Sequence, residues 1–433
     1  MPTPAAFSTL RVQIGGIPET ELVSEYGPPA YVYDAAKILE RINELRAFDS
    51  IRFAQKACSN LAILNFMRLN GVLVDAVSAG EIQRALAAGY SPQGDPPPNV
   101  YTADVFDRET IDLIERHCLH INCGSPDMID QLAERPIGGA ESCITLRVNP
   151  GFGHGHSRKT NTGGELSKHG IWHEQLGDCV LKAKKQGLRV TGLHMHIGSG
   201  TNLEHLQQVC GAMHRSALEV GNSIVSISAG GGLPVPYQAG ESYIDMSAYY
   251  SLWDHVRRKL TVEFGHPVHL EIEPGRYLVA ESGYLVTEIR AVKRSGNNTF
   301  YMVDGGFNNL IRPSMYGSYH PISIVPANGK LEHRAEQDVV VGGPLCESGD
   351  IFTQEEGGVI CSRKLPVAKV GDFLVLEVAG AYGFVMGSNY NSKPLAPEIL
   401  VVSGYSQLIR ARQTFEDLIR GESIPQMYDR NTQ

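Results

Sequence analysis

The chain lacks any long hydrophobic run. No segment of its 433 residues approaches 18 uninterrupted apolar positions, about the length that a membrane-spanning helix needs. Residues 1–18 also lack the basic start and apolar stretch of a secretory signal. We therefore expect a soluble, cytoplasmic protein.

Paired cysteines and surplus positive charge are missing as well. The eight cysteines form no CxxC motif and no dense framework, which predicts reduced thiols in a cytosolic protein. The formal net charge is -9 and the isoelectric point is near 5.9, whereas nucleic acids and anionic membranes attract basic surfaces. We therefore expect a small-molecule substrate, and neither nucleic acid nor membrane as a partner.

A regular alternation of short β-rich runs and amphipathic helix-length stretches is present up to Arg276. The expected strands span residues 51–54, 72–77, 100–102, 119–122, 143–148, 190–196, 224–228 and 268–273. The expected helices span residues 61–69, 81–88, 108–117, 127–134, 174–186, 203–220 and 248–264. Eight strands in this alternation predict an α/β fold of the (β/α)8 barrel type, with a doubly wound parallel sheet as the alternative.

After Arg276 the helical rhythm fades, and alternating strands are expected at residues 284–292, 300–303, 338–341, 373–378 and 399–402. The chain is also longer than the size at which single hydrophobic cores stop growing. We therefore expect a barrel domain over residues 35–276 and a mainly β domain made of residues 1–34 and 277–433. The extended segment 31–33 is expected to join the second domain from the N-terminal side.

Polar and glycine residues gather at the carboxyl ends of the expected strands, where barrel enzymes carry their chemistry. They are Lys56, Asp75, Ser78, Arg147, Asn149, His196, Ser199, Gly230, Gly231, Gly232, Glu273 and Arg276. A random scatter of surface residues would not favour one rim, so this rim is the expected active site.

Lys56 lies among small and apolar neighbours in FAQKACSN, directly after the first strand. Desolvation favours the neutral form of a lysine, and a neutral amine attacks carbonyl groups. The alternative is a lysine just past a strand end with its ammonium group in water, which is the commoner case for a lysine considered alone.

An anion site is expected after the last two strands. SAGGG (228–232) follows the seventh strand, and Arg276 ends EPGR after the eighth. Successive glycines let backbone N–H groups approach a phosphate, and barrels often hold phosphates there; a flexible turn is the alternative. Glu273 is either an ordinary salt-bridged carboxylate or a group that keeps a pyridine nitrogen protonated and so deepens an electron sink.

His194 and His196 lie two residues apart on the sixth strand and face the same way. This spacing suits a metal-dependent hydrolase. The other strand ends carry mainly glycines, an arginine and a lysine rather than further ligands, so we expect no metal. His196 is better suited to stacking on an aromatic cofactor ring. The similarly spaced pair His154 and His156 lies in a glycine-rich loop and is expected to act as polar groups of that loop.

Two motifs of the β domain carry further candidates. In GGPLCESGD (342–350), Cys346 is either a buried structural thiol or a proton donor beside Glu347, a carboxylate that recognises an ammonium group. In IRPSMYGSYH (311–320), Arg312 and Tyr316 suit the binding of a carboxylate. The alternative for Arg312 is an ordinary surface arginine.

Seven motifs occur in this order: FAQKACSN, HMHIGSG, AGGG, EPGR, RPSMY, CESGD and GAYG. Together they resemble those of the pyridoxal-phosphate-dependent decarboxylases with an alanine-racemase-like fold, and within that family those of the diaminopimelate decarboxylases of lysine synthesis. The resemblance runs from about residue 31 to residue 397. One departure is His169 in SKHG, where the family leads us to expect an aromatic residue, so no role is assigned to the 151–170 loop.

The resemblance implies pyridoxal 5'-phosphate as the cofactor and decarboxylation as the activity. The implied catalytic residues are Lys56, which would hold the cofactor covalently, His196 stacked on its ring, Glu273 at the ring nitrogen, and Cys346, which would protonate the product. The implied cofactor-binding residues are Lys56, Asp75, His196, Ser199, Gly231, Gly232, Glu273, Gly275, Arg276 and Tyr382. The implied substrate-binding residues are Arg276, Arg312, Tyr316, Glu347 and Tyr382. Family members are dimers that borrow CESGD from the partner, which implies a homodimer with shared sites.

The substrate implied in this way is meso-2,6-diaminopimelate, converted to L-lysine. Its distal ammonium and carboxylate match Glu347 and Arg312, whereas ornithine or lysine would leave Arg312 unpaired in a desolvated pocket. Three alternatives stay open: a decarboxylase of another basic or carrier-bound amino acid, a non-catalytic pyridoxal-phosphate carrier, and a metal-dependent hydrolase. The carrier is disfavoured because it needs neither a proton donor nor a clamp for the distal end.

Overall fold

The computed structural model describes residues 4–135, 142–153, 162–196, 198 and 203–425. The chain forms two compact units. One comprises Met1–Phe7, Asp34–Gly283 and Val378–Val385, and the other comprises Ser8–Tyr33, Tyr284–Glu377 and Met386–Gln433. Residues 4–7, 277–283 and 378–385, which the expected division assigns to the β domain, therefore group with the first unit.

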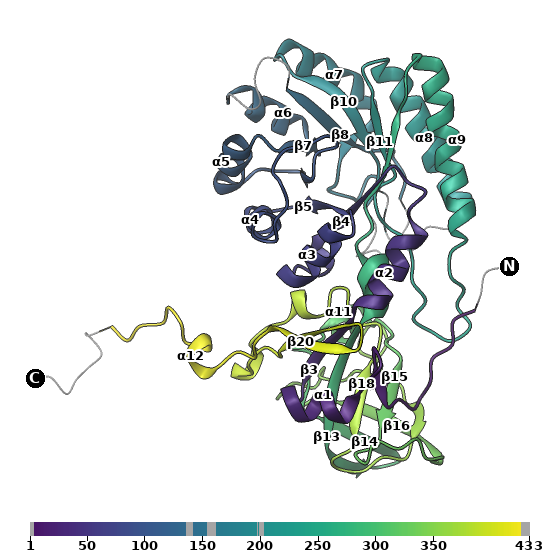
Figure 1. Ribbon diagram of the computed structural model, residues 1–433, viewed down its shortest axis with the longest axis vertical. Helices are drawn as coiled ribbons and strands as arrows, with labels where there is room; N and C mark the ends of the chain where they lie inside the picture. Colours follow the sequence, from purple (N-terminus) through teal and green to yellow (C-terminus); the bar gives the residue numbers. More distant parts are fainter. Residues whose placement is uncertain (1–3, 136–141, 154–161, 197, 199–202, 426–433) are drawn as a thin grey trace, which may run out of the picture. The chain divides into compact units, whose positions relative to one another are not determined.

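The first unit is built around eight parallel strands (Figure 1). They are β4 (Ser50–Ala54), β5 (Leu73–Ala76), β6 (Asn99–Ala103), β7 (His120–Cys123), β8 (Cys143–Asn149), β10 (Arg189–His194), β11 (Ser226–Ser228) and β12 (His269–Ile272). Each pairs with the next, and β12 pairs with β4, so the ring is closed. The predicted (β/α)8 barrel is confirmed. The doubly wound alternative is wrong, because an open sheet would leave two strands with an unpaired edge.

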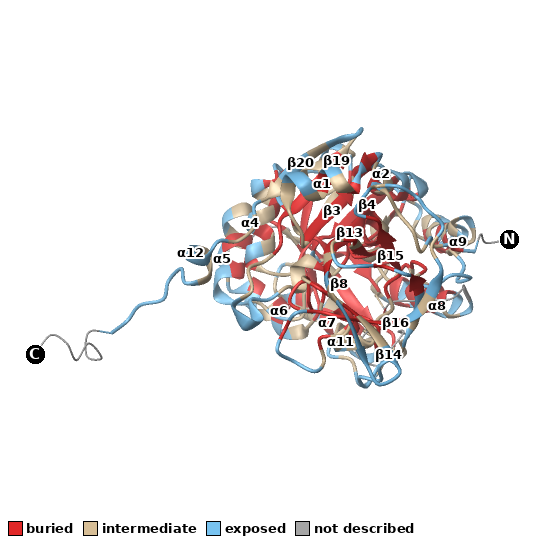
Figure 2. Ribbon diagram, turned by 90° about the horizontal axis from the view of Figure 1, so that it is seen from below, coloured by how far each residue is buried: buried red, intermediate tan, exposed pale blue. Residues whose placement is uncertain are grey.

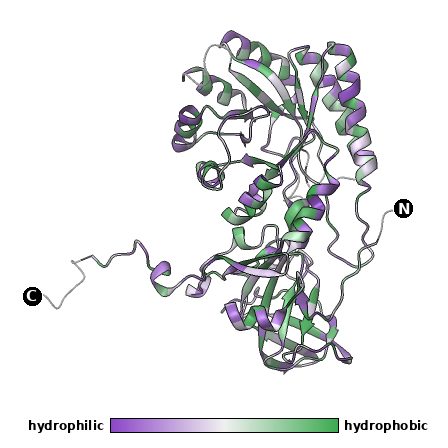
Figure 3. Ribbon diagram, in the orientation of Figure 1, coloured by the Kyte–Doolittle hydropathy of each residue, from purple (hydrophilic) through white to green (hydrophobic). Residues whose placement is uncertain are grey.

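The seven helices that the sequence predicts are present as α3 (Leu61–Leu69), α4 (Ala79–Ala87), α5 (Arg108–His117), α6 (Pro126–Ala133), α7 (Leu176–Lys185), α8 (Leu203–Val220) and α9 (Met246–Phe264). Two further helices, α2 (Ala35–Glu44) before β4 and α10 (Arg276–Val279) after β12, are not among the predicted ones. Side chains cap several of them: Asn60, Ser78 and Asp107 accept hydrogen bonds from first-turn N–H groups of α3, α4 and α5. Hydrophilic and hydrophobic residues alternate along α8 and α9 (Figure 3), so each helix can bury one face.

The barrel strands are buried because both their faces are covered. All five residues of β4 are buried, as expected for a parallel sheet enclosed by helices. Figure 2 shows the contrast between β4 and the exposed faces of α4 and α5. Since the strands are parallel, their carboxyl ends share one rim, and the residues that follow them converge there.

The second unit is mainly β. Its strands are β3 (Ala30–Asp34), β13 (Gly283–Ser295), β14 (Asn298–Val303), β15 (Ile322–Val325), β16 (Glu336–Gly342), β17 (Arg363–Pro366), β18 (Phe373–Leu376), β19 (Glu398–Val402) and β20 (Tyr405–Arg410). The main sheet has the order β17-β16-β14-β13-β3-β19-β20, and β18 pairs with both β13 and β15. The predicted entry of segment 31–33 into this sheet is confirmed, since β3 lies between β13 and β19. Strands β15, β17 and β20 are not among the predicted ones.

Smaller elements complete the two units. They are β1 (Gln13–Ile14), β2 (Ile17–Pro18), α1 (Glu19–Tyr26), β9 (Ile171–Trp172), α11 (Arg312–Tyr316), α12 (Phe415–Leu418), and short 3-10 turns at Gln55–Ala57, His173–Gln175, Ala280–Ser282, Phe384–Met386 and Tyr390–Ser392. In the second unit, Ile14, Leu22, Val32, Val286 and Val375 pack in one apolar core. Among the described helices, none combines the length and apolar character that crossing a membrane requires.

Candidate active site

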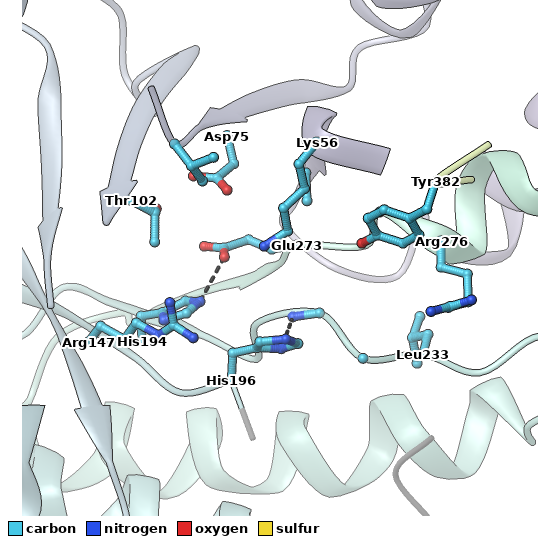
Figure 4. A pocket seen from close by; sticks show the side chains of 15 residues that line it. Lys56, Asp75, Thr102, Arg147, His194, His196, Leu233, Glu273, Arg276 and Tyr382 are labelled. Atoms are coloured by element: carbon cyan, nitrogen blue, oxygen red, sulfur yellow. Dashed lines mark hydrogen bonds and ion pairs between the residues drawn. The ribbon is translucent and has the colours of Figure 1, made fainter. Parts of the chain in front are cut away.

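A pocket opens at the carboxyl ends of the barrel strands, within the first unit (Figure 4). Its lining residues are Ala54, Lys56, Asp75, Val77, Thr102, Arg147, His194, His196, Gly231, Gly232, Leu233, Glu273, Gly275, Arg276 and Tyr382. Nine of the residues that the sequence nominated for cofactor or catalysis are therefore brought together. The nominated Ser199 lies outside the described residues, as do His154 and His156.

Lys56 reaches the pocket because strand β4 ends directly before it. The chain leaves β4 in a 3-10 turn, Gln55–Ala57, which turns the lysine side chain into the pocket (Figure 4). The carbonyl of Ala57 accepts a hydrogen bond of 2.8 Å from the backbone N–H of Tyr382. This bond joins the turn that carries Lys56 to the segment that carries Tyr382, so two lining residues are positioned together.

Two buried carboxyl groups face the pocket, one on each side of the β12–β4 pairing that closes the barrel. Asp75 lies on β5 and Glu273 follows β12, and their exposed fractions are 3% and 8%. Burial and the neighbouring Glu273 raise the pKa of Asp75 well above its usual range, although Lys56 opposes the shift. Burial also acts to raise the pKa of Glu273, but His194, Arg52 and Ser228 together lower it below its usual range. The pocket therefore holds one anionic carboxylate and one carboxyl group that favours its proton.

The contact with His194 is the main reason why the pKa of Glu273 is lowered while that of Asp75 is raised. His194 ends β10, is 1% exposed, and its Nε2 lies 2.7 Å from Glu273 Oε2 (Figure 4). Ser228, at the end of β11, donates from Oγ to Glu273 Oε1 over 3.0 Å. Three adjacent strand ends thus meet at one carboxylate.

His196 lies two residues beyond His194 but has a different partner. Its Nδ1 accepts a hydrogen bond of 3.1 Å from the N–H of Gly231. Burial, followed by the charges of Arg147 and Lys56, lowers the pKa of His196 well below its usual range, so the ring is neutral at physiological pH. Within the described residues no three His, Cys, Asp or Glu side chains are grouped to hold a metal ion, and the two histidines make separate contacts rather than converging.

The glycine turn after β11 is built by close backbone contact. A Cβ atom at Gly231 would collide with the carbonyl oxygen of Glu273, and one at Gly232 with that of Gly198. Gly232 also has φ of 96°, which side-chain-bearing residues rarely adopt. This backbone needs glycine at both positions, and it brings the turn to the pocket without a side chain between its N–H groups and a ligand.

Arg276 begins α10 at the next strand end. Its Nη1 donates to the hydroxyl of Tyr237 over 2.8 Å, and its guanidinium carbon lies 5.3 Å from the ring centre of Tyr382. These contacts hold a cation beside the glycine turn in the orientation that Figure 4 shows. A cation and a glycine turn on one rim form a suitable site for a phosphate.

Six lining residues carry no predicted role: Ala54, Val77, Thr102, Arg147, His194 and Leu233. Arg147 belongs to the strand-end set and His194 to the HxH pair, so both were visible in the sequence as candidates. Their part in the pocket depends on which neighbours face them across the barrel, which a sequence pattern does not contain. The apolar lining residues give no chemical signal at all.

The residues nominated for the distal end of the substrate and for the proton donor belong to the second unit, except Arg276 and Tyr382. Arg312, in α11, is 6% exposed, and its Nη1 lies 3.1 Å from His320 Nε2, while Nη2 donates to Ser318 Oγ over 3.3 Å. Cys346 and Glu347 are exposed on the loop after β16, and Tyr316 is partly buried. The alternative of a buried structural thiol is therefore wrong for Cys346 in the single chain.

Comparison with known proteins shows to which family the chain belongs. Residues 35–280 match the family model described as "Pyridoxal-dependent decarboxylase, pyridoxal binding domain". The chain is 55% identical over 404 residues to the diaminopimelate decarboxylase of Escherichia coli K12, covering 93% of this chain and 96% of that protein. It is 52% identical over 402 residues to that of Streptomyces coelicolor, covering 93% and 91%.

Solved structures agree. A crystal structure of diaminopimelate decarboxylase with 53% identity superposes with a TM-score of 0.91 over 96% of this chain and 98% of that chain. The diaminopimelate decarboxylase of Helicobacter pylori complexed with L-lysine is 30% identical and gives a TM-score of 0.78, covering 93% and 98%. The chain therefore belongs to the pyridoxal-dependent decarboxylase family, within its diaminopimelate decarboxylase branch.

Proposed function

We propose that this chain converts meso-2,6-diaminopimelate to L-lysine and carbon dioxide, with pyridoxal 5'-phosphate held in the barrel pocket. The observation that carries the proposal is the convergence of Lys56, Glu273 and the Gly231–Gly232 turn on one space in a chain that is 55% identical to an enzyme of that name. The Helicobacter pylori relative was crystallised with L-lysine, which is the product of this reaction.

The pocket residues fit the cofactor. Asp75 Oδ1 is buried without a hydrogen-bond partner in the described chain, and such an atom is costly unless a ligand contacts it. Gly231, Gly232, Gly275 and Arg276 would surround the phosphate. When bound, the cofactor supplies an electron sink for the electrons released as carbon dioxide leaves.

The protein's own groups divide the remaining tasks. The amine of Lys56 would attach the cofactor and is released when the substrate amine takes its place. Glu273 would hold a proton at the ring nitrogen, which its anionic state favours. His196, neutral and fixed by the Gly231 N–H, would lie flat against the ring without adding charge, and Tyr382 would contact cofactor or substrate.

The second unit would supply the groups that select the substrate. Arg312 and Tyr316 would bind the distal carboxylate, Glu347 the distal ammonium, and Cys346 would return a proton to the carbon that lost carbon dioxide. Chemistry supports this assignment, since a guanidinium and a carboxylate match the two charges at that end. Arg312 already contacts His320 and Ser318, which hold its guanidinium in a defined orientation.

We also propose that the protein is a cytoplasmic homodimer in which each active site contains residues of both subunits. Cys346 and Glu347 are exposed on the single chain, as groups that act in a second copy would be. None of the eight cysteines, all of which lie in the described residues, forms a disulfide, which supports a reducing compartment.

The purified protein should be yellow. It should convert meso-diaminopimelate to lysine and carbon dioxide, and it should release no carbon dioxide from ornithine, lysine or arginine. Borohydride reduction should fix the cofactor to Lys56, identified by mass spectrometry of the labelled peptide. Lys56→Ala should lose both the label and at least about 10³-fold of the activity, whereas Lys185→Ala, on α7, should keep both. Lysine or ornithine as the better substrate would overturn the substrate assignment, and a label elsewhere would overturn the role of Lys56.

A further inference from the structure

Two acids share the pocket, and their contacts are unequal. Glu273 has His194 Nε2 at 2.7 Å from one oxygen and the hydroxyl of Ser228 at 3.0 Å from the other. Asp75 has a buried oxygen, Oδ1, with no hydrogen-bond partner in the described residues. Two buried carboxyl groups near each other do not both ionise readily, so the better-contacted one keeps the charge.

The Ser228 contact is directional. Its Oγ accepts a hydrogen bond of 3.2 Å from the N–H of Gly230. Its own proton is then free to point at Glu273 Oε1. A hydroxyl that donates to a carboxylate stabilises the anion rather than the acid, so this bond also favours a charged Glu273.

The His194 contact is the closer of the two, with Nε2 at 2.7 Å from Glu273 Oε2. His194 is 1% exposed, so water screens the pair little. The charged and titratable groups around Glu273 come from five strands and their ends: Arg52 and Lys56 (β4 and its turn), Asp75 (β5), Arg147 (β8), His194 and His196 (β10), and Glu271 (β12). Of these, His194 is the group in direct contact with the carboxylate and the largest influence that lowers the pKa of Glu273.

We propose that His194 is a positioning residue that keeps Glu273 anionic and aimed at the ring nitrogen of the cofactor, and so sets the strength of the electron sink. This inference rests on the proposed function and adds to it a role for a residue that acts through Glu273. It also gives the first histidine of HMHIGSG a task distinct from that of His196. Without His194, the carboxylate would lose the contact that favours its charge over that of Asp75.

A merely structural role for His194 predicts a different outcome. Loss of packing would lower the melting temperature and the affinity for the cofactor, but it would not change the protonation of a cofactor that still binds. Loss of the contact between His194 and Glu273 acts on the proton at the ring nitrogen. The measurement that separates the two is the ¹⁵N chemical shift of the ring nitrogen in holoenzyme loaded with ring-¹⁵N pyridoxal phosphate.

In the parent holoenzyme, this shift should be that of a protonated pyridine between about pH 6 and 9. His194→Gln keeps a polar side chain but removes the imidazole that contacts Glu273 Oε2, so the ring nitrogen should lose its proton at a pH lower by at least about one. The kcat should fall about tenfold or more, with KM changed less than about threefold. His214→Gln is the matched control, because His214 contacts Glu263 at 3.1 Å on the outer helices, and it should leave every reading unchanged.

An unaltered ¹⁵N titration in a folded, cofactor-loaded His194→Gln protein would overturn the inference. If that variant fails to bind cofactor, Ser228→Ala serves instead, and it should move the titration in the same direction by a smaller amount; no movement there would equally overturn the inference. Failure of the proposed function is read separately, from a parent protein that neither takes up the cofactor nor releases lysine.

Discussion

Glu19 shows what burial does to a single carboxyl group in the second unit. It opens α1, has no exposed surface, and neither carboxyl oxygen has a hydrogen-bond partner in the described chain. Arg11 lies 3.9 Å away but donates at 2.9 and 2.7 Å to Glu377 instead. Burial, with Glu377 adding to it and Arg11 opposing, raises the pKa of Glu19 to about 8.

A carboxyl group whose pKa is raised in the folded state destabilises that state as pH rises. The unfolded chain gives up the Glu19 proton above about pH 4.5, while the folded chain keeps it until about pH 8. Stability is therefore lost progressively across that window. Glu19→Gln should raise the free energy of unfolding by about 2 kcal/mol or more at pH 8, and by little at pH 5.

Thermal and urea unfolding of parent and variant at several pH values would measure this. Glu21→Gln, an exposed position on the same helix, is the control and should leave the pH dependence unchanged. A Glu19→Gln protein with the same stability gain at pH 5 and pH 8 would show that shape, and not charge, is responsible.

For single residues, the sequence predicts which side chains line the pocket better than it predicts which of them contact one another. Lys56, Glu273 and Arg276 follow strands, and strand ends in a barrel converge, so their meeting was predictable. The two histidines have different partners: His194 contacts Glu273, and His196 contacts Gly231. This difference depends on the turn after β10, because the strand ends at His194 and the regular alternation of side-chain directions ends with it.

The loop after β16 is organised by one buried carboxylate. Asp350 is 4% exposed; its Oδ1 accepts from the N–H of Phe307 at 2.7 Å and its Oδ2 from that of Leu345 at 2.8 Å. A Cβ at Gly306 or Gly343 would meet this carboxylate, so the glycines let the backbone close around it. Cys346 and Glu347 are displayed on the loop that this arrangement holds.

Asp350→Asn should loosen that loop, because an amide has one acceptor oxygen and would leave one of the two N–H groups without a partner. The expected loss of stability is about 1–3 kcal/mol. Cys346 should then react faster with a thiol reagent, by about tenfold if the loop opens with a similar free-energy change. Stability and thiol kinetics would be measured together.

Asp338→Asn is the control, since Asp338 is exposed on the adjoining strand β16, and it should alter neither reading. If Cys346 reactivity in Asp350→Asn equals that of the parent while stability falls, the carboxylate supports the fold but does not order the loop.

Among the elements, helices with full apolar periodicity were predicted to the residue: α3, α5 and α8 have the predicted bounds. Two strands that were missed, β17 and β20, are the edges of their sheet. The sequence of β17 is Arg-Lys-Leu-Pro, and charge and proline on an edge prevent further pairing. The features that protect such a strand from aggregation also remove the pattern by which a strand is recognised.

For the molecule as a whole, the proposal of a homodimer with shared sites can be tested by mixing two inactive variants. Lys56→Ala lacks the barrel nucleophile and Cys346→Ala lacks the proposed donor of the other unit. If each site combines one barrel with the partner's loop, a mixed dimer contains one intact site. Subunit exchange should then restore about a quarter of the parent activity, because about half of the dimers are mixed and each has one of two sites intact.

Mixing Lys56→Ala with His196→Ala is the control and should restore nothing, since both losses fall in the same barrel pocket. Mixed dimers would be verified by native mass spectrometry. Their presence without recovered activity in the first mixture would contradict a site shared between subunits.

The position of β3 has a consequence for biosynthesis. This strand is translated before the entire barrel, yet its neighbours β13 and β19 begin at Gly283 and end at Val402. A ribosome adding about 5–20 residues per second needs roughly 20 to 75 seconds to proceed from the end of β3 at Asp34 to the end of β19 at Val402. Until β13 is made, β3 has no neighbouring strand to pair with, and the sheet of the second unit can be completed only after all the barrel strands have been synthesised.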